Sequence, residues 1–561
     1  MFTLIRKQLE EVDNLIIVSV FSKALEIIEE VIKSKEIRHE KKIVCNIYKS
    51  DLLNKMGNNQ EAFDLIDKIL KQFNTQEIST LKINAMIQKG EALFFLDNKE
   101  GVKEIINRIE DELSKLKDIS KKEITKIEAS ILKLKLYITS SRIEPKKYLK
   151  FAQKCNKLAE KNEDKLLTIF SLKEIALAYY RLNERNKCQE NIKEAYKLAI
   201  SVGSKQEQEN CLWKLSAYEP NREKILEYSE KAISIHEEND FKLYSYSKYV
   251  YLGCIYVRNC EFEKALTSLH KAEKYLEKDS KESSNIYFIY SRLFNLKGEL
   301  NLAYENTKRA LEIALTFDNK GIVAQSYYDM TLLAIELENL NLAEEHLKEL
   351  HQLKINLDEE EIHQMYLLAS ALTLKANKGI RDWSKAIELL EQIIEDEALS
   401  STMLINATLN LCELLIKEIE LFGEDRILDS IKSHLILLYD IAEKQSIYWL
   451  IIEILRLESQ LALLAFDTAK AKELLEEALE IAQEKGIHKL VVEITNEQLE
   501  IDEKITILEK LQELDAPLIE TIKHDHLINN IKEINEEITT VKSCSGSKNT
   551  IEYRKLFALK I

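Results

Sequence analysis

The stretch Tyr249-Val-Tyr-Leu-Gly-Cys-Ile-Tyr256 decides the fold of this chain. Its bulky residues recur three and four positions apart around Gly253, and Ala265, Leu269 and Ala272 follow it. Residues spaced by three, four and seven positions lie on one face of an α-helix. Ala265 and Ala272 therefore share a face, and Gly253 leaves room on the preceding helix. The spacing predicts a pair of helices that approach each other closely.

The same small position recurs along almost the whole chain. It returns at intervals of 36 to 51 residues, with a mean of about 41. Nine of its twelve occurrences are Ala, Gly or Cys, although Leu and Ile dominate the apolar residues elsewhere. The pattern predicts a repeated helix pair. The positions are Ala24, Ala62, Gly101, Ala152, Cys188, Ile225, Ala265, Ala303, Ala343, Ala386, Leu428 and Ala471.

This pattern resembles the tetratricopeptide (TPR) repeat, W-x2-L-G-x2-Y followed by A-x3-F, with Tyr replacing Trp and Leu replacing Phe. The resemblance covers roughly residues 20–485. The mean interval is longer than the 34 residues of the strict repeat, as in the TPR-like arrays of signal-responsive regulators and scaffold proteins. The resemblance implies an all-α fold, a right-handed TPR-like α-solenoid built as a superhelix of antiparallel helix pairs.

We expect this solenoid to be continuous rather than divided into independent globules. The segment that follows the array begins a second helix at Pro517, where a missing N–H costs little. The expected regions are a TPR-like repeat array of about twelve helix pairs in residues 1–485, C-terminal capping helices in 486–541 (at about 487–513 and 516–541), and a flexible joint with a short basic and apolar tail in 542–561.

Composition narrows the class of protein. The 561 residues include only 11 Gly and 3 Pro, and 31% are charged, which is typical of long amphipathic helices. A formal net charge of −16 argues against a broad nucleic-acid-binding surface. The sequence has no apolar run long enough for a membrane span and no secretory signal. Its eight scattered cysteines lack a CxxC pair, so we expect a cytoplasmic protein.

The sequence shows no pattern typical of an enzyme. No Gly-rich phosphate loop and no GxSxG nucleophile elbow is present. His346 and His351 are five residues apart, so they do not share a helix face as a metal-binding pair would. An unrecognised pairing of Cys254 with Cys260 or His270 is left open, but a small interior cysteine is the favoured interpretation. We therefore expect no catalytic activity, no cofactor and no metal site.

The resemblance places partner binding on the inner wall of the superhelix, which the first helix of each pair lines. Arginines there would hold acidic or C-terminal peptides through bidentate contacts. The alternative is that each arginine pairs with Glu or Asp of the adjacent repeat. The inner-wall positions that we select are Lys173, Tyr180, Arg181, Arg258, Arg292, Asn295 and Tyr328.

Tyrosines near the best-preserved repeat add a second candidate surface. Repeat packing accounts for Tyr249 and Tyr256 but not for Tyr244, Tyr246 and Tyr251, and an aromatic cluster is a reasonable binding anchor. Packing of these tyrosines against the neighbouring repeat is the alternative. Of the three, Tyr251 is included among the candidate partner-binding residues.

The chaperone-binding members of the family hold a C-terminal carboxylate with Lys and Asn at two positions of the first helix. Those positions here contain Lys173 with Leu177 in one repeat and Phe288 with Arg292 in another, so neither matches. The chain is therefore not expected to bind chaperone tails.

The sequence predicts a protein- or peptide-binding scaffold or adaptor. The alternative is a regulatory sensor that responds to a peptide or metabolite. It would have no DNA-binding or catalytic domain of its own, because the repeats begin within about 20 residues of Met1. In either case the expected partner is a protein, peptide or small ligand, with no nucleic acid and no membrane. The sequence does not predict an oligomeric state.

Overall fold

The structure is a computed structural model in which the described residues form twenty-five α-helices and no β-strand. Contacts between residues divide the chain into two compact units, Met1–Lys248 and Tyr249–Ile561. The sequence analysis did not anticipate this boundary, which lies within a helix of the best-preserved repeat. The described residues are 2–34, 37–73, 79–116, 119–239, 241, 245–276, 280–357, 359–377, 379–396, 400–422, 427–445, 447–465 and 467–513.

The helices of unit 1 are α1 (Phe2–Ile17), α2 (Phe21–Lys33), α3 (His39–Lys55), α4 (Asn59–Leu70), α5 (Thr80–Phe95), α6 (Lys99–Lys115), α7 (Lys121–Ile138), α8 (Pro145–Lys161), α9 (Lys165–Arg181), α10 (Arg185–Ser201), α11 (Lys205–Tyr218) and α12 (Arg222–Glu238). The boundary falls in α13 (Ser245–Arg258).

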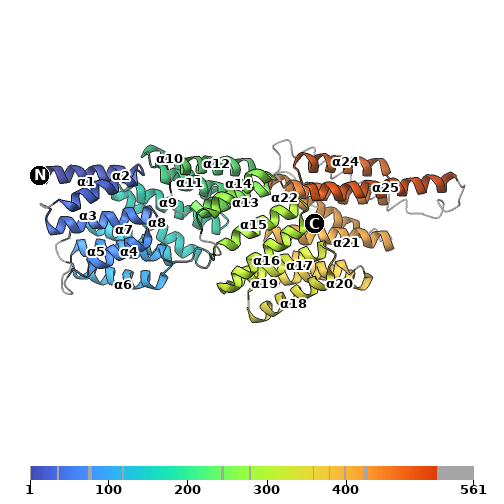
Figure 1. The fold of residues 1–561 in the computed structure, drawn as a ribbon, viewed down its shortest axis with the longest axis horizontal. Helices are drawn as coiled ribbons and strands as arrows, with labels where there is room; N and C mark the ends of the chain where they lie inside the picture. The colour runs from blue at the N-terminus through green and yellow to red at the C-terminus, as the bar shows by residue number, and fades with distance from the viewer. Residues whose placement is uncertain are drawn as a thin grey trace, which may run out of the picture. The chain divides into compact units, whose positions relative to one another are not determined.

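The helices of unit 2 after α13 are α14 (Phe262–Glu273), α15 (Ser283–Leu296), α16 (Leu300–Thr316), α17 (Lys320–Glu336), α18 (Leu340–Asn356), α19 (Glu360–Ala376), α20 (Ile380–Ile394), α21 (Ser401–Phe422), α22 (Leu428–Gln445), α23 (Tyr448–Leu464), α24 (Thr468–Glu484) and α25 (His488–Glu513). Consecutive helices pack side by side within each unit (Figure 1).

We call the odd-numbered helices A helices and the even-numbered ones B helices. Each of the twelve predicted small positions falls on a B helix, α2 to α24. Ten of the twelve side chains or backbone positions are at most 2% exposed. The predicted pairing of the helices is therefore confirmed, and the fold is an all-α, TPR-like solenoid.

Two of the twelve small positions are wrong. Gly101 lies in the first turn of α6, where Asn98 caps its N–H at 2.8 Å, and Val102 takes the fully buried place. Ile225 is only half-buried. In α12 the close approach falls instead at Ser229, whose hydroxyl lies 2.7 Å from that of Ser216 on α11. A hydroxyl pair replaces the expected apolar contact there.

Gly253 shows why the quoted stretch needs a glycine. A β-carbon at this position would lie 2.9 Å from Cδ2 of Leu269, a fully buried residue of α14. In two other repeats a serine occupies the corresponding place and donates to the carbonyl of the small residue. Ser50 Oγ lies 3.2 Å from Ala62 O, and Ser459 Oγ lies 3.0 Å from Ala471 O.

Short connections fix the antiparallel arrangement of each pair. Ten of the twelve A-to-B connections contain three residues, and the exceptions follow α7 and α21. The α15–α16 connection is representative: Gly298 adopts a positive φ of 81°, and Glu299 N donates to Phe294 O at 2.8 Å. Such a left-handed residue satisfies the last carbonyls of the first helix before the next one starts.

Candidate functional site

The A helices form a continuous layer in each unit. In unit 2, α17, α19, α21, α23 and α25 each contact the next A helix, and α25 also contacts α15. The B helices pack against the other side of this layer. We call the surface of the A helices away from the B helices the inner face. Side chains there come from sequence positions about one repeat apart.

Two of the selected inner-wall residues are buried. Lys173 is 6% exposed, and its Nζ lies 2.5 Å from Glu207 Oε2 on the next A helix. Tyr328 is also 6% exposed, and burial raises the pKa of its hydroxyl above the usual value. A partner cannot reach either side chain without a rearrangement. The sequence pattern identified their helix face but not their depth.

Arg181 lies at an exposed end of α9 beside an aromatic pair. The ring of Tyr180 stacks on that of Tyr218, with centroids 4.7 Å apart, and the Arg181 guanidinium lies 5.7 Å from the Tyr180 ring. Tyr180 is 39% exposed. These three side chains form a cation–aromatic patch on unit 1, at the positions that the repeat pattern predicted for Tyr180 and Arg181.

Arg258 and Arg292 are both exposed in unit 2. Among the described residues, neither these two arginines nor Arg181 forms an ion pair, so pairing with the adjacent repeat does not occur. Arg292 nevertheless lies near Asp329 of α17. Burial raises the pKa of Asp329 to about 6, and the positive charge of Arg292 opposes this rise.

Asn295 connects three A helices. Its Nδ2 donates to Glu336 Oε2 at 3.3 Å, and its Oδ1 accepts from Lys489 Nζ at 3.4 Å. Lys489, at the start of α25, also pairs with Glu336 at 2.8 Å. Asn295 is therefore a contact between α15, α17 and α25. The same residues border a surface cavity of about 390 Å³ that Leu300 and Val492 also line.

The tyrosine cluster is only partly described. Tyr244 lies outside the described residues, while Tyr246 and Tyr251 are half-buried and make contacts of their own. Tyr251 is thus no free anchor. The neighbouring Tyr249 is buried and stacks on Tyr275, with ring centroids 5.9 Å apart.

A charge cluster around Arg456 was not found from the sequence. Its guanidinium donates to three carboxylates: Glu453 at 2.8 Å, Glu493 at 2.7 Å and Glu497 at 2.7 Å. Burial raises the pKa of Glu453 to about 7, and Arg456 opposes that rise only in part. The signal was present in the sequence, because Arg456 and Glu497 are 41 residues apart, the mean interval of the repeats.

A second ion pair links the neighbouring A helices α19 and α21. Lys375 Nζ donates to Asn410 Oδ1 at 2.6 Å and also binds the carboxylate of Glu413. Lys375 and Arg456 together hold the pKa of Glu413 below its usual range, although burial alone would raise it. The inner face of unit 2 is therefore polar and largely self-paired, apart from its exposed arginines.

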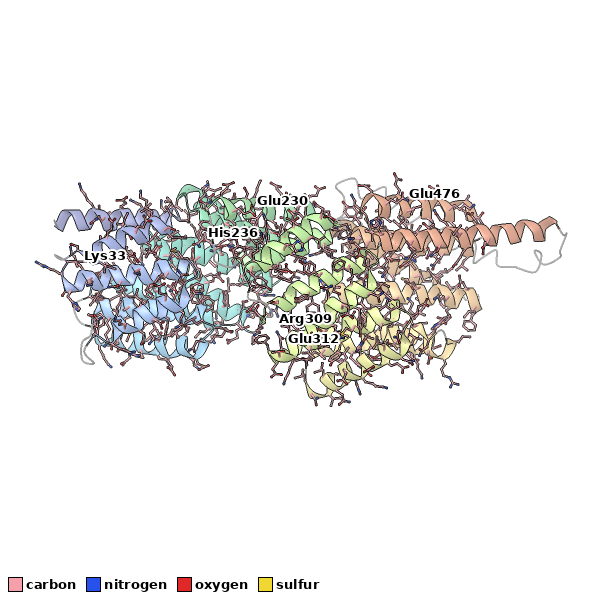
Figure 2. All side chains as sticks on the ribbon, in the orientation of Figure 1. Lys33, Glu230, His236, Arg309, Glu312 and Glu476 are labelled. Atoms are coloured by element: carbon pink, nitrogen blue, oxygen red, sulfur yellow. The ribbon has the colours of Figure 1, made fainter. Side chains whose placement is uncertain are left out.

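Unit 1 contains a buried Ser–His–Glu arrangement (His236 is labelled in Figure 2). Ser245 Oγ lies 2.9 Å from His236 Nε2, and His236 Nδ1 lies 2.9 Å from Glu209 Oε1. This is the order of a hydrolytic triad. However, Ser245 is 1% exposed and donates to Phe241 O at 3.0 Å, so its hydroxyl is not available as a nucleophile.

Glu209 is the centre of this arrangement. Its Oε1 also accepts from Lys248 Nζ at 2.6 Å and from Trp213 Nε1 at 3.1 Å. Burial alone would raise the pKa of Glu209, but His236 and Lys248 hold it below its usual value. The four groups therefore connect α11, α12 and the first turn of α13, which is a structural role.

The remaining features give no sign of metal or membrane chemistry within the described part of the chain. No helix there has the length and apolar character needed to cross a bilayer. Its seven cysteines are free thiols, and it brings no three metal-ligating side chains together. Cys544 lies outside the described residues.

The fold and the inner face together define a TPR-like helical-repeat protein. No protein-family model matches the chain, and no curated protein matches it. Several solved structures are similar to it at low identity. They include aspartyl phosphate phosphatase F from Bacillus subtilis, with 15% identity over 62% of this chain and 93% of that one at a TM-score of 0.38.

Two further solved structures resemble the chain to a similar degree. Yeast Tom70 has 13% identity over 90% of this chain and 98% of its own, with a TM-score of 0.35. The quorum sensor NprR from B. thuringiensis, in its apo form, has 13% identity over 71% and 99%, with a TM-score of 0.39. Likenesses this distant say nothing about what the chain binds.

Proposed function

We propose that the chain is a protein- or peptide-binding scaffold whose inner-face arginines hold acidic segments of a partner. The observation that carries the proposal is that Arg181, Arg258 and Arg292 are exposed and form no ion pair among the described residues. In a chain with a net charge of −16, other charged side chains of the inner face are paired. Three unpaired guanidinium groups on one kind of helix are therefore a distinctive surface.

The chemistry of these arginines favours a carboxylate partner. A guanidinium offers two parallel N–H groups that match a carboxylate, which gives both affinity and orientation. On unit 1, the stacked rings of Tyr180 and Tyr218 add a flat apolar surface beside Arg181. A peptide that presents an acidic residue next to an aromatic or aliphatic one fits this patch. Arg258 and Arg292 offer unit 2 further points for acidic residues.

Charge reversal tests the proposal. Full-length protein, Arg181→Glu and the double variant Arg258→Glu/Arg292→Glu are used as baits in a lysate of the cells that produce the protein, with quantitative mass spectrometry as readout. A hydrogen bond to a charged group contributes about 1.5–3 kcal/mol, so we expect each captured partner to fall by about tenfold or more with at least one variant.

Arg309→Glu is the matched control. Arg309 lies on the B helix α16, where it pairs with Glu312 at 2.7 Å and does not reach the inner face (Figure 2). This variant makes the same change of net charge and should capture the same partners as the wild type. Equal losses with the control would assign binding to net charge alone. Unchanged capture by both inner-face variants would contradict the proposal.

A further inference from the structure

The last described helix is longer than the helices that it packs against. α25 has 26 residues, whereas α23 and α24 have 17 each. At a rise of about 1.5 Å per residue, α25 extends about 13 Å farther than a 17-residue neighbour can cover. A helix of matching length would be needed to cover it from end to end.

One face of α25 is apolar and exposed. Val492 is 60% exposed and Leu499 is 59% exposed, and the seven residues between them place both on one face. On a different face, Leu490, Ile494 and Ile501 are buried against α23 and α24. Every preceding A helix also has a following B helix along its length. α25 has none among the described residues.

The chain that follows α25 has the features of the missing B helix. Residues 516–541 number 26, the same length as α25. They begin with a proline at position 517, and Pro145 opens α8 in the same way. Apolar residues then recur at intervals of four and three, which is the spacing of an amphipathic helix. These are Leu527, Ile531, Ile534, Ile538 and Val541.

The connection also has the required length. α25 ends at Glu513, so a helix that starts at Pro517 leaves three residues, 514–516. Ten of the twelve A-to-B connections have this length. A tether this short keeps the segment at a high effective concentration next to α25, so it outcompetes a second copy of the chain.

We propose that residues 516–541 form a helix that packs antiparallel on the Val492–Leu499 face of α25 and completes a thirteenth helix pair. The short connection sets the register. Its centre is residue 515, which places Leu499 opposite Ile531 and Val492 opposite Ile538, sixteen and twenty-three residues to either side.

Known contacts in other pairs support this way of assigning the register. Gly253 lies seven residues before the centre of its connection and approaches Leu269, nine residues after it. Ser459 lies seven before its own centre and bonds Ala471, five after it. Partners are thus equidistant from the centre to within two residues. Both proposed contacts join the exposed stripe of α25 to the apolar stripe of the segment.

A disulfide test in the full-length protein decides between the occupants of this face. Leu499→Cys and Ile531→Cys are combined in a Cys544→Ser background and oxidised gently. We expect an intramolecular disulfide in most molecules, because β-carbons of facing residues lie within bridging distance. The matched control combines Leu499→Cys with Glu533→Cys, which turns the second thiol away from the stripe and should bridge at least tenfold less.

Hydrogen exchange provides a readout that needs no added cysteine. In the full chain, Ile531→Asp with Ile534→Asp should raise the exchange rates of the α25 amides at least tenfold, whereas Lys532→Asp should not. Disulfides formed only between two chains would assign the face to a second copy and overturn the proposal. Absence of any disulfide, together with unchanged exchange in the double Asp variant, would overturn it as well.

Discussion

Glu453 lies in a cluster where carboxylates outnumber cations. Arg456 contacts Glu453, Glu493 and Glu497, and the charge of Glu413 also lies near Glu453. Because burial raises the pKa of Glu453 to about 7, the folded protein holds a proton there that the unfolded chain releases at lower pH. The native state therefore binds more protons than the unfolded state between pH values near 4.5 and 7.

Glu453→Gln should stabilise unit 2 at pH 8. Stability of the wild type falls as the pH rises across that window, since the native state then has to give up the extra proton. At about 1.4 kcal/mol per pKa unit, the loss is about 2–3 kcal/mol. A neutral glutamine removes it, so urea titrations should show the variant more stable at pH 8 and nearly equal to wild type at pH 5.

Glu497→Gln is the informative comparison for Glu453→Gln. Glu497 forms the closest two-pronged contact with Arg456, through Nε at 3.2 Å and Nη2 at 2.7 Å. Its loss should cost about 1–3 kcal/mol at both pH values. If both glutamine variants destabilised the protein equally at pH 8, Glu453 would be an ordinary ionised partner of Arg456 and the argument from its pKa would be wrong.

Glu209→Gln should weaken unit 1 strongly. Glu209 is fully buried and accepts from His236, Lys248 and Trp213 through one oxygen. Removing its charge leaves the Lys248 ammonium without its counter-ion, a change that costs about 3–5 kcal/mol. The denaturation midpoint, followed by the fluorescence of Trp213, should fall accordingly. An unchanged midpoint would show that Lys248 is not charged in the folded state.

The pH dependence of the wild type provides a second test at Glu209. Its depressed pKa means that the stabilisation is present above the unfolded value, about 4.3, and is lost as the pH falls through the folded value. Acid titration of unit 1 should therefore begin only below pH values near 4. In Glu209→Gln this step should be absent, while the loss from other carboxylates remains.

Single residues also show how far the candidate site follows from the sequence. Arg181, Arg258 and Arg292 were selected from repeat register, and the structure leaves all three exposed. Register gives the face of a helix but not the partner that covers it. Lys173 was selected by the same rule, yet Glu207 on the next A helix binds it and it is buried. Such contacts between repeats depend on superhelical geometry, which one repeat does not encode.

At the scale of helix pairs, Gly253 makes a direct test of the signature stretch. Gly253→Leu should destabilise unit 2 by at least about 2–3 kcal/mol, because even a β-carbon would lie 2.9 Å from the fully buried Leu269. The measurement is the midpoint of urea unfolding followed by the fluorescence of the tryptophans in unit 2.

Gly321→Leu is the control for that substitution. Gly321 lies in the first turn of α17, and the nearest atom to a β-carbon there is Asn319 Oδ1 at 3.9 Å. Leucine has a higher helix propensity than glycine by up to about 1 kcal/mol, so this variant should be neutral or slightly more stable. Similar losses at both sites would show that the close approach at Gly253 is not what makes glycine necessary.

The helix pairs were the most predictable level of the structure. Small residues mark close approaches whatever the rest of the repeat contains, so Ala265, Ala303 and Ala343 are all fully buried as expected. Prediction failed where another chemistry performs the same task. In α12 the hydroxyls of Ser216 and Ser229 replace the small apolar contact, and a pattern built on alanine does not detect them.

For the molecule as a whole, the division at residues 248 and 249 predicts two unfolding units. In a repeat array each pair contacts mainly its neighbours, so the effect of a substitution spreads only as far as the packing is continuous. Each unit has hydrophobic clusters of its own, and the three tryptophans divide between them. Trp213 reports on unit 1, whereas Trp383 and Trp449 report on unit 2.

We expect Glu209→Gln to shift only one of two transitions. In a Trp383→Phe/Trp449→Phe background, urea unfolding followed at Trp213 should move to lower denaturant. In a Trp213→Phe background the transition of unit 2 should stay within about 0.5 kcal/mol of wild type, because distant sites without shared partners act independently. A shift of equal size in both backgrounds would mean that the chain unfolds as one cooperative array. The boundary would then mark a difference in contact density rather than a division in stability.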